Sequence, residues 1–139
     1  MIQLIVGEKG KGKTKVLLEK ANNEIKSANG NIVYLDKCAQ HMYELNNKIR
    51  LIDVTGFPVT NVDEFVGFVC GIISQEHDLE QMYLDSFLTI AALDADNAEE
   101  ALLKLQKIGT QFNVTFIISI SMTKDQFSAE MQQNIIAEV

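Results

Sequence analysis

The chain has 139 residues, of which 47% are hydrophobic and one is proline, and its net charge at pH 7 is −7. This length and composition fit one folded domain, residues 1–139, and argue against intrinsic disorder. No apolar stretch approaches the ~20 residues needed to cross a bilayer, and no signal-peptide pattern is present, so we expect no membrane insertion. Cys38 and Cys70 form no disulfide framework, which favours a reducing, cytoplasmic compartment.

The expected elements alternate between strands and helices along the whole chain. In chain order they are a strand at residues 1–6, a helix at 14–27, a strand at 31–36, a short helix or a loop at 37–48, a strand at 49–54, a helix after Asn61, a strand at 81–87, a helix at 96–108, a strand at 113–121 and a helix from about Thr123. Gly30 and Gly109 are expected to stop the helices that precede them, because glycine readily adopts the left-handed conformation that ends helices.

Two of the expected helices start with a capping-box pattern. Asn61 is followed three residues later by Glu64, and Thr123 is followed in the same way by Gln126. After Asn61, apolar residues between positions 65 and 73 recur at the spacing of an amphipathic helix. These patterns predict helices at both places.

Several expected strands, including residues 113–121, are apolar on both faces, as in a parallel sheet covered by helices on both sides. The alternation of strands and helices predicts a three-layer α/β/α domain with about five mainly parallel strands. In such domains the carboxyl ends of the strands share one edge of the sheet, where ligands bind. We expect the functional residues at that edge.

Positive charge gathers at the N-terminus of an otherwise acidic chain. The first 20 residues contain five lysines and two glutamates, a net charge of +3, whereas the other 119 residues carry −10. A compact cluster of cations on an acidic domain favours one local anion site. It does not favour a nucleic-acid surface, which would need a broad basic face.

Residues 7–14 read Gly-Glu-Lys-Gly-Lys-Gly-Lys-Thr and match G-x-x-x-x-G-K-[ST] at every fixed position. The glycines let the backbone turn around phosphate groups, and the start of the next helix adds partial positive charge. We expect Lys13 to reach the β- and γ-phosphates and the Thr14 hydroxyl to ligate Mg²⁺. The loop does not fit the dinucleotide-binding pattern G-x-G-x-x-G. Counted from Gly10, that pattern requires a glycine at position 15, where this chain has Lys15. The expected nucleotide-binding residues are Gly7, Glu8, Lys9, Gly10, Lys11, Gly12, Lys13, Thr14 and Lys15.

This motif resembles the Walker A loop of P-loop nucleoside triphosphatases, and the strand–helix alternation extends the resemblance to the whole domain. The chain also resembles small stand-alone bacterial P-loop proteins, some of which carry a twitching-motility ATPase label. Pilus-retraction motors have a further N-terminal domain and histidine- and aspartate-containing boxes, for which 139 residues leave no room. The resemblance implies ATP, or another nucleoside triphosphate, and Mg²⁺ as cofactors.

A P-loop needs an acidic partner for Mg²⁺, which normally ends a strand beside the strand that precedes the loop. Three expected strands end in aspartate, at Asp36, Asp53 and Asp85. Asp85 follows a long helix and an apolar run, which resembles the Walker B pattern, so we expect it to serve the metal and, with Lys13, the chemistry. Asp53 is the runner-up, because it begins a D-x-x-G sequence resembling the γ-phosphate switch of GTPases. Asp36 is expected at the rim of the sheet, in solvent or near a substrate.

The residues that would activate an attacking water are incomplete. In many P-loop ATPases a glutamate follows the Walker B aspartate, but here the residue after Asp85 is Ser86. Glu64 or Glu80 could replace that glutamate, although no spacing selects either one.

Other recognition features are also partial. At residues 123–126 the aspartate of the guanine clamp [NT]-K-x-D comes one position early, which favours adenine and leaves GTP as an alternative. Ser119 or Ser121 could sense the γ-phosphate, or could simply be hydrogen-bonded at the end of a strand. Arg50, the only arginine, is expected away from the phosphates. Because phosphoryl transfer usually recruits arginine, this argues against a kinase and implies that a protein partner or a second copy supplies any arginine finger.

Cys38 and His41 have a spacing that occurs in zinc sites. However, Cys70 and His77 do not form a standard second pair of ligands. The sequence alone therefore does not predict a zinc site.

Together these features predict a Mg²⁺-dependent ATP-binding domain of the RecA-like or a related class, with weak or partner-stimulated ATPase activity. A non-hydrolysing nucleotide-binding module is the main alternative, and a small-molecule kinase or a GTPase is less favoured.

Overall fold

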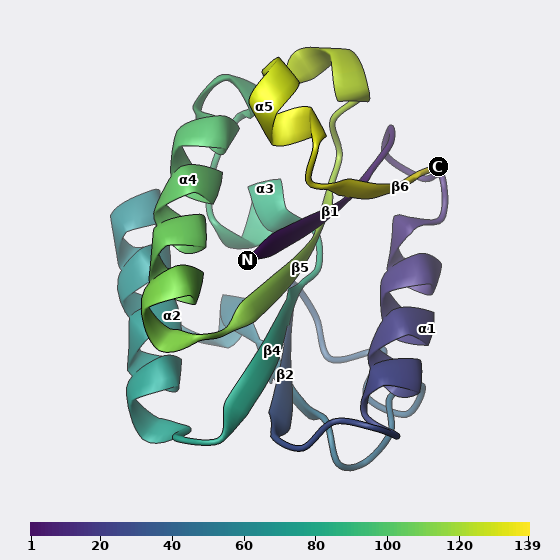
Figure 1. Cartoon of the computed structure of the whole chain (residues 1–139), viewed down its shortest axis with the longest axis vertical. Helices are drawn as coiled ribbons and strands as arrows, with labels where there is room; N and C mark the ends of the chain where they lie inside the picture. Colours follow the sequence, from purple (N-terminus) through teal and green to yellow (C-terminus); the bar gives the residue numbers. More distant parts are fainter.

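A sheet of six parallel strands runs through the centre of the computed structural model, which describes residues 1–139 (Figure 1). In spatial order it is β3-β2-β4-β5-β1-β6. The strands are β1 (Ile2–Val6), β2 (Asn31–Asp36), β3 (Arg50–Asp53), β4 (Leu79–Leu84), β5 (Thr115–Ile120) and β6 (Ile135–Glu138). The helices are α1 (Lys13–Glu24), α2 (Val62–Gln75), α3 (Phe87–Ile90), α4 (Ala95–Phe112) and α5 (Ala129–Gln132), with single 3₁₀ turns η1 (Val54–Gly56) and η2 (Lys124–Gln126). The predicted α/β class with a parallel sheet is confirmed.

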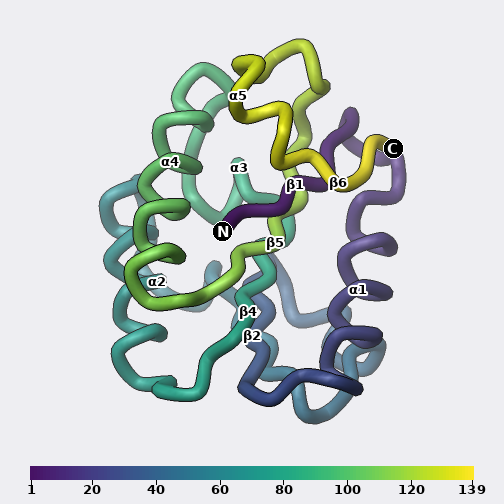
Figure 2. Tube along the Cα trace, in the orientation of Figure 1, coloured from purple at the N-terminus to yellow at the C-terminus, as the bar shows by residue number.

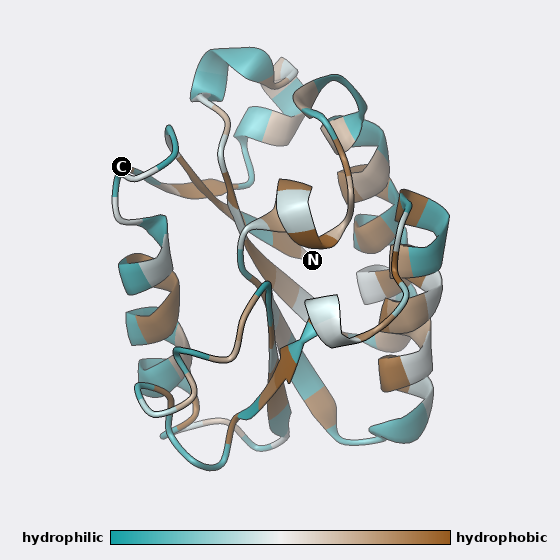
Figure 3. Ribbon diagram, turned by 180° about the vertical axis from the view of Figure 1, so that it is seen from behind, coloured by the Kyte–Doolittle hydropathy of each residue, from teal (hydrophilic) through white to brown (hydrophobic).

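Helices cover both faces of the sheet, α1 on one side and α2 and α4 on the other (Figure 1). Successive side chains of a strand point to opposite faces of the sheet, so each inner strand contributes side chains to two hydrophobic cores. On β2, Val33 and Leu35 belong to a cluster of 26 buried residues on the α2/α4 side, whereas Ile32 and Tyr34 belong to a cluster of 10 with α1. In Figure 3 the apolar faces of the helices turn towards the sheet. The α1 face therefore has the smaller core, and one helix anchors it.

The helix predicted after Asn61 is α2, and its first turn is capped as the sequence suggests. The Asn61 side chain accepts a hydrogen bond from the Glu64 backbone N–H at 2.9 Å. The Glu64 carboxylate, however, accepts from the N–H and the hydroxyl of Thr60, one residue earlier than a capping box requires. None of the helices combines the length and the apolar character needed to cross a membrane.

The helix predicted at residues 96–108 extends further than expected, because Gly109 does not end it. Helix α4 continues to Phe112, and Asn113 terminates it with a left-handed φ of 56°. A Cβ atom on Gly109 would lie 2.6 Å from the Val114 carbonyl oxygen. The glycine is needed for this close approach of the helix to the start of β5, not for a turn.

The C-terminal segment differs most from the prediction. The capping box of Thr123 and Gln126 is present, but it caps only the single turn η2 instead of a long helix. After the short helix α5, the chain forms β6, which pairs in parallel with β1, so the first and the last strand lie side by side (Figure 2). Alternate residues of β6 are half-buried and exposed, as in an edge strand. The last residue continues the pairing, because the Val139 N–H donates to the Val6 carbonyl at 2.9 Å.

Two smaller differences affect the ligand edge. The strand predicted at residues 81–87 ends earlier, at Leu84, because Ser86 has a left-handed backbone (φ 55°) and the short helix α3 follows. Residues 37–48 consist of turns without a regular helix, which resolves the helix-or-loop alternative in favour of a loop.

Candidate functional site

The carboxyl ends of β1, β2, β4 and β5 surround a cleft of about 600 Å³. Only 2 of its 16 lining residues are hydrophobic, so the cleft suits a charged or strongly hydrated ligand. The lining residues are Lys9, Gly10, Gly12, Lys13, Thr14, Asp36, Lys37, Cys38, Gln40, His41, Asp85, Ser86, Leu88, Thr89, Ser119 and Ser121. This is the edge at which ligands of parallel α/β sheets bind.

Residues 7–14, the glycine loop, form one wall of the cleft between β1 and α1. Gly7 packs against the end of the chain, where a Cβ would lie 2.4 Å from the Val139 carbonyl oxygen. Gly10 and Gly12 have positive φ angles of 82° and 96°, while Lys11 and Lys13 do not. Such alternation of left-handed and right-handed residues turns successive backbone N–H groups towards a common anion site.

The backbone N–H groups from Glu8 to Lys15 donate no hydrogen bond to any other group of the protein. Three of them, at residues 13–15, belong to the first turn of α1, where a helix cannot satisfy its own donors. The remaining donors lie in the loop itself. The loop and helix start therefore present an uninterrupted series of donors for an anion.

Lys13 lies inside the loop and is only 7% exposed. Its ammonium donates to the carbonyl oxygens of Gly7 at 3.0 Å and Glu8 at 2.8 Å. Since an ammonium has three donors, one remains for a ligand. Burial lowers the pKa of Lys13, and the negative charge of Asp85 partly offsets that effect.

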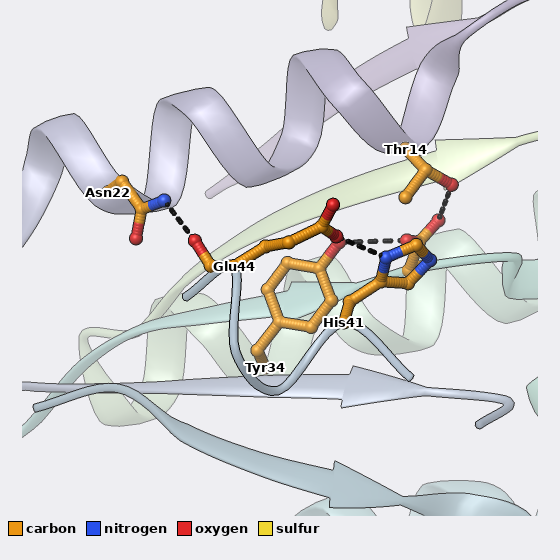
Figure 4. A network of polar contacts seen from close by, with 6 residues as sticks. Thr14, Asn22, Tyr34, His41 and Glu44 are labelled. Atoms are coloured by element: carbon orange, nitrogen blue, oxygen red, sulfur yellow. Dashed lines mark hydrogen bonds and ion pairs between the residues drawn. The ribbon is translucent and has the colours of Figure 1, made fainter. Parts of the chain in front are cut away.

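Asp85, which directly follows β4, is the centre of a buried network of hydroxyl groups. Its Oδ1 accepts hydrogen bonds from Thr14 Oγ1 at 3.2 Å and Ser119 Oγ at 2.6 Å, and its Oδ2 accepts from the Tyr34 hydroxyl at 2.8 Å. Figure 4 shows Tyr34 and Thr14 directed to this carboxylate. The two residues expected at Mg²⁺, Thr14 and Asp85, are 71 positions apart in sequence and are in direct contact.

The strand order differs from our expectation that the acidic partner ends a strand beside the loop strand. β5 lies between β1 and β4, so the Asp85 strand is one strand further away. The intervening strand contributes Ser119, which is buried, donates to Asp85 and accepts from the Ser86 N–H at 2.9 Å. Ser119 therefore bridges the gap, whereas Ser121 is exposed at the cleft.

Asp36 is not at the rim of the sheet as the sequence suggested, because β3 adds a further strand beyond β2. Its side chain is 2% exposed, and its Oδ1 accepts from the Lys37 N–H at 2.7 Å, while Oδ2 has no hydrogen-bond partner. Burial, and next the negative charge of Asp85, raise the pKa of Asp36 to about 6. The same two causes raise the pKa of Tyr34 far above its usual range.

Several candidate residues lie away from the cleft. Asp53 ends the edge strand β3, where its Oδ1 accepts from the N–H and the hydroxyl of Thr55. Glu80 lies near the start of β4, at the opposite end from Asp85, and Glu64 is engaged with the turn before α2. Arg50 starts β3 and pairs with Glu76 at 3.5 Å. No glutamate and no arginine lines the cleft.

The sequence analysis did not bring together one group of candidate metal ligands that lines the cleft. Asp36, Cys38 and His41 offer ligand atoms that all lie within 4.8 Å of one another. The pattern D-x-C-x-x-H could have indicated it, but only with knowledge that the strand end and the following turns fold together. Tyr34 had no distinguishing signal, since a tyrosine in an apolar strand usually serves packing.

The cleft thus combines a wall of N–H donors and an ammonium with a wall of carboxylates and hydroxyls. The first suits phosphate groups, and the second suits a divalent cation that accompanies them. No protein-family model and no curated protein sequence matches this chain. The geometry of the cleft is therefore the basis for inferring its function.

Proposed function

We propose that this protein is a P-loop nucleoside triphosphatase domain that binds Mg²⁺-ATP in the cleft and hydrolyses it weakly or when stimulated by a partner. The observation that carries the proposal is the series of unpaired N–H groups from Glu8 to Lys15 around the Lys13 ammonium, with the Thr14–Asp85 contact beside it. Donors without a protein partner, a cation and a carboxylate at one sheet edge are the parts that phosphate and Mg²⁺ binding require.

Each part has a distinct role in this proposal. The loop N–H groups and the third donor of Lys13 bind the β- and γ-phosphates, and the N-terminal end of α1 adds partial positive charge. Thr14 and Asp85 would hold Mg²⁺, which neutralises phosphate charge when bound. The hydroxyls of Tyr34 and Ser119 fix the Asp85 carboxylate in place.

Slow turnover is supported by what the cleft lacks. Phosphoryl transfer is accelerated by an arginine that stabilises charge and by a group that positions water. No arginine and no glutamate lines the cleft, and Ser86 follows Asp85. We infer that a partner protein or a second copy of the chain supplies the arginine. The same observation supports the alternative of a binding module that does not hydrolyse the nucleotide.

A thermal-melting series tests the binding. At 100 times its dissociation constant, Mg²⁺-ATP should raise the melting temperature by roughly 8–10 °C. Lys13→Ala should abolish the shift, whereas Lys11→Ala should retain it, because the Lys11 side chain does not line the cleft. GTP in a parallel series shows which base is preferred. If no nucleoside triphosphate shifts the wild-type protein, the proposal is wrong.

A phosphate-release assay distinguishes an ATPase from a nucleotide-binding module that does not hydrolyse ATP. At high protein concentration the wild type should release phosphate slowly, without an added acceptor, and Lys13→Ala should not. Binding with no release would instead identify a nucleotide-binding module.

The free thiols of Cys38 and Cys70 agree with a reducing, cytoplasmic location.

A further inference from the structure

The group formed by Asp36, Cys38 and His41 also lines the cleft, where β2 ends. Asp36 ends β2, and the turns that follow bring Cys38 and His41 back beside it, so that one ligand atom from each lies within 4.8 Å of the others. A tetrahedral metal with bonds of about 2.0–2.3 Å needs donor separations of roughly 3.3–3.8 Å. Small side-chain rotations of the two half-buried residues would close that difference.

Asp36 gives this group its strongest requirement for a cation. Its carboxylate is almost completely buried, and Oδ2 has neither a hydrogen-bond donor nor an ion-pair partner. Its other oxygen is already engaged by the Lys37 N–H. An unpaired, buried carboxylate oxygen is costly and rare, and this one belongs to a residue that lines the cleft.

His41 is held as histidine ligands of metals usually are. Its Nδ1 lies 2.5 Å from Glu44 Oε2. Figure 4 marks this contact between the two side chains. The carboxylate thus fixes the ring and leaves Nε2 as the nitrogen able to ligate. The backbone of Glu44 is itself anchored, because its carbonyl accepts from the Asn22 amide on α1 at 2.8 Å. Cys38 forms no disulfide, so its thiol is available to ligate.

We propose that Asp36, Cys38 and His41 form a binding site for a zinc-class divalent metal, with Glu44 as the residue that orients His41. A mixed set of carboxylate, thiolate and imidazole favours Zn²⁺ or Co²⁺ over Mg²⁺, which prefers oxygen ligands alone. Three protein ligands leave a fourth position for water on the cleft side. The site shares no ligand residue with the Thr14–Asp85 pair, although both line the same cleft, and binding there requires no nucleotide.

Cobalt titration of the nucleotide-free protein, in the presence of a reductant that does not bind metal, tests the site. Co²⁺ should produce a thiolate-to-cobalt charge-transfer band that saturates at one metal per chain and disappears when Zn²⁺ is added. Cys38→Ser should remove the band. Asp36→Asn and His41→Ala should weaken Co²⁺ binding at least tenfold, and Glu44→Gln should weaken it about tenfold.

The chain supplies its own matched controls, Cys70→Ser and His77→Ala, which remove the only other cysteine and histidine. Both variants should bind Co²⁺ as the wild type does, and circular dichroism melts should show that every variant is folded. Absence of the band in the wild type, its survival in Cys38→Ser, or its loss in Cys70→Ser would overturn the proposal. Because no nucleotide is present, these results are independent of whether the protein binds ATP.

Discussion

The two walls of the cleft are built in different ways. The glycine loop is one continuous stretch of chain, and its donors are set by the backbone conformation of Gly10 and Gly12. The opposite wall is assembled from the ends of three strands, with Asp36 from β2, Asp85 after β4 and Ser119 on β5. Short-range backbone geometry therefore sets the positions of the donors in the glycine loop, whereas the sheet topology sets the positions of the carboxylates and the hydroxyl in the opposite wall.

The difference also appears in how each wall satisfies its polar groups. The loop leaves its N–H groups without protein partners, and its residues 8–12 are exposed to solvent. The carboxylate wall is buried, and there Asp85 accepts three hydroxyl donors while one oxygen of Asp36 accepts none. Mutations of loop residues other than the glycines should therefore change binding more than stability, and mutations in the other wall should change both.

The largest expected effect concerns Asp36 and pH, measured with a chelator present. Because the pKa of Asp36 is about 6 when folded, above its usual 3.8, the folded state binds more protons between these values. Wild-type stability should therefore fall as pH rises through about 4–6, by up to about 3 kcal/mol. Asp36→Asn, which cannot ionise, should be more stable than wild type by that amount at pH 8.

Urea denaturation at pH 4 and pH 8 measures this difference, and Asp53→Asn is the matched control at another strand end. The gap between Asp36→Asn and wild type should close at pH 4. A gap of the same size at both pH values would mean that ionisation of Asp36 is not its cause.

The next largest effect concerns the cation. Asp85→Asn removes the charge beside Thr14, so the affinity for ATP in the presence of Mg²⁺ should fall by about 2 kcal/mol, or about 30-fold. Without Mg²⁺, the affinity of this variant should be close to that of the wild type. Calorimetry with Asp53→Asn as control makes the comparison. A greater loss of affinity for Asp53→Asn would mean that Asp53, on the edge strand β3, serves the metal instead of Asp85.

The smallest effect concerns the hydroxyl that supports Asp85. Tyr34→Phe leaves Asp85 Oδ2 buried without its donor, which should lower the free energy of unfolding by about 1.5 kcal/mol. Tyr83→Phe is a matched control, because Tyr83 stacks on Tyr34 and its hydroxyl bonds instead to neutral Gln81. If chemical denaturation shows equal losses in free energy of unfolding for the two variants, the hydrogen bond to Asp85 stabilises the protein no more than the hydrogen bond to Gln81.

The same distinction explains what could be predicted from the sequence. The glycine loop and the cap of α2 at Asn61 depend on residues a few positions apart, and local patterns were enough to find them. Strand β6 and the depth of Asp36 depend on which strand lies beside which, and no local pattern encodes that. The residues from Ile135 to Glu138 fit a helix or a strand equally well until β1 supplies an edge.

A crystal structure with Mg²⁺ and a non-hydrolysable ATP analogue would test most directly whether the two walls form one site. We expect the β- and γ-phosphates on the N–H groups between Glu8 and Lys15, with Mg²⁺ between Thr14 and Asp85. Nucleotide bound outside the glycine loop, or Mg²⁺ at Asp53, would contradict this expectation.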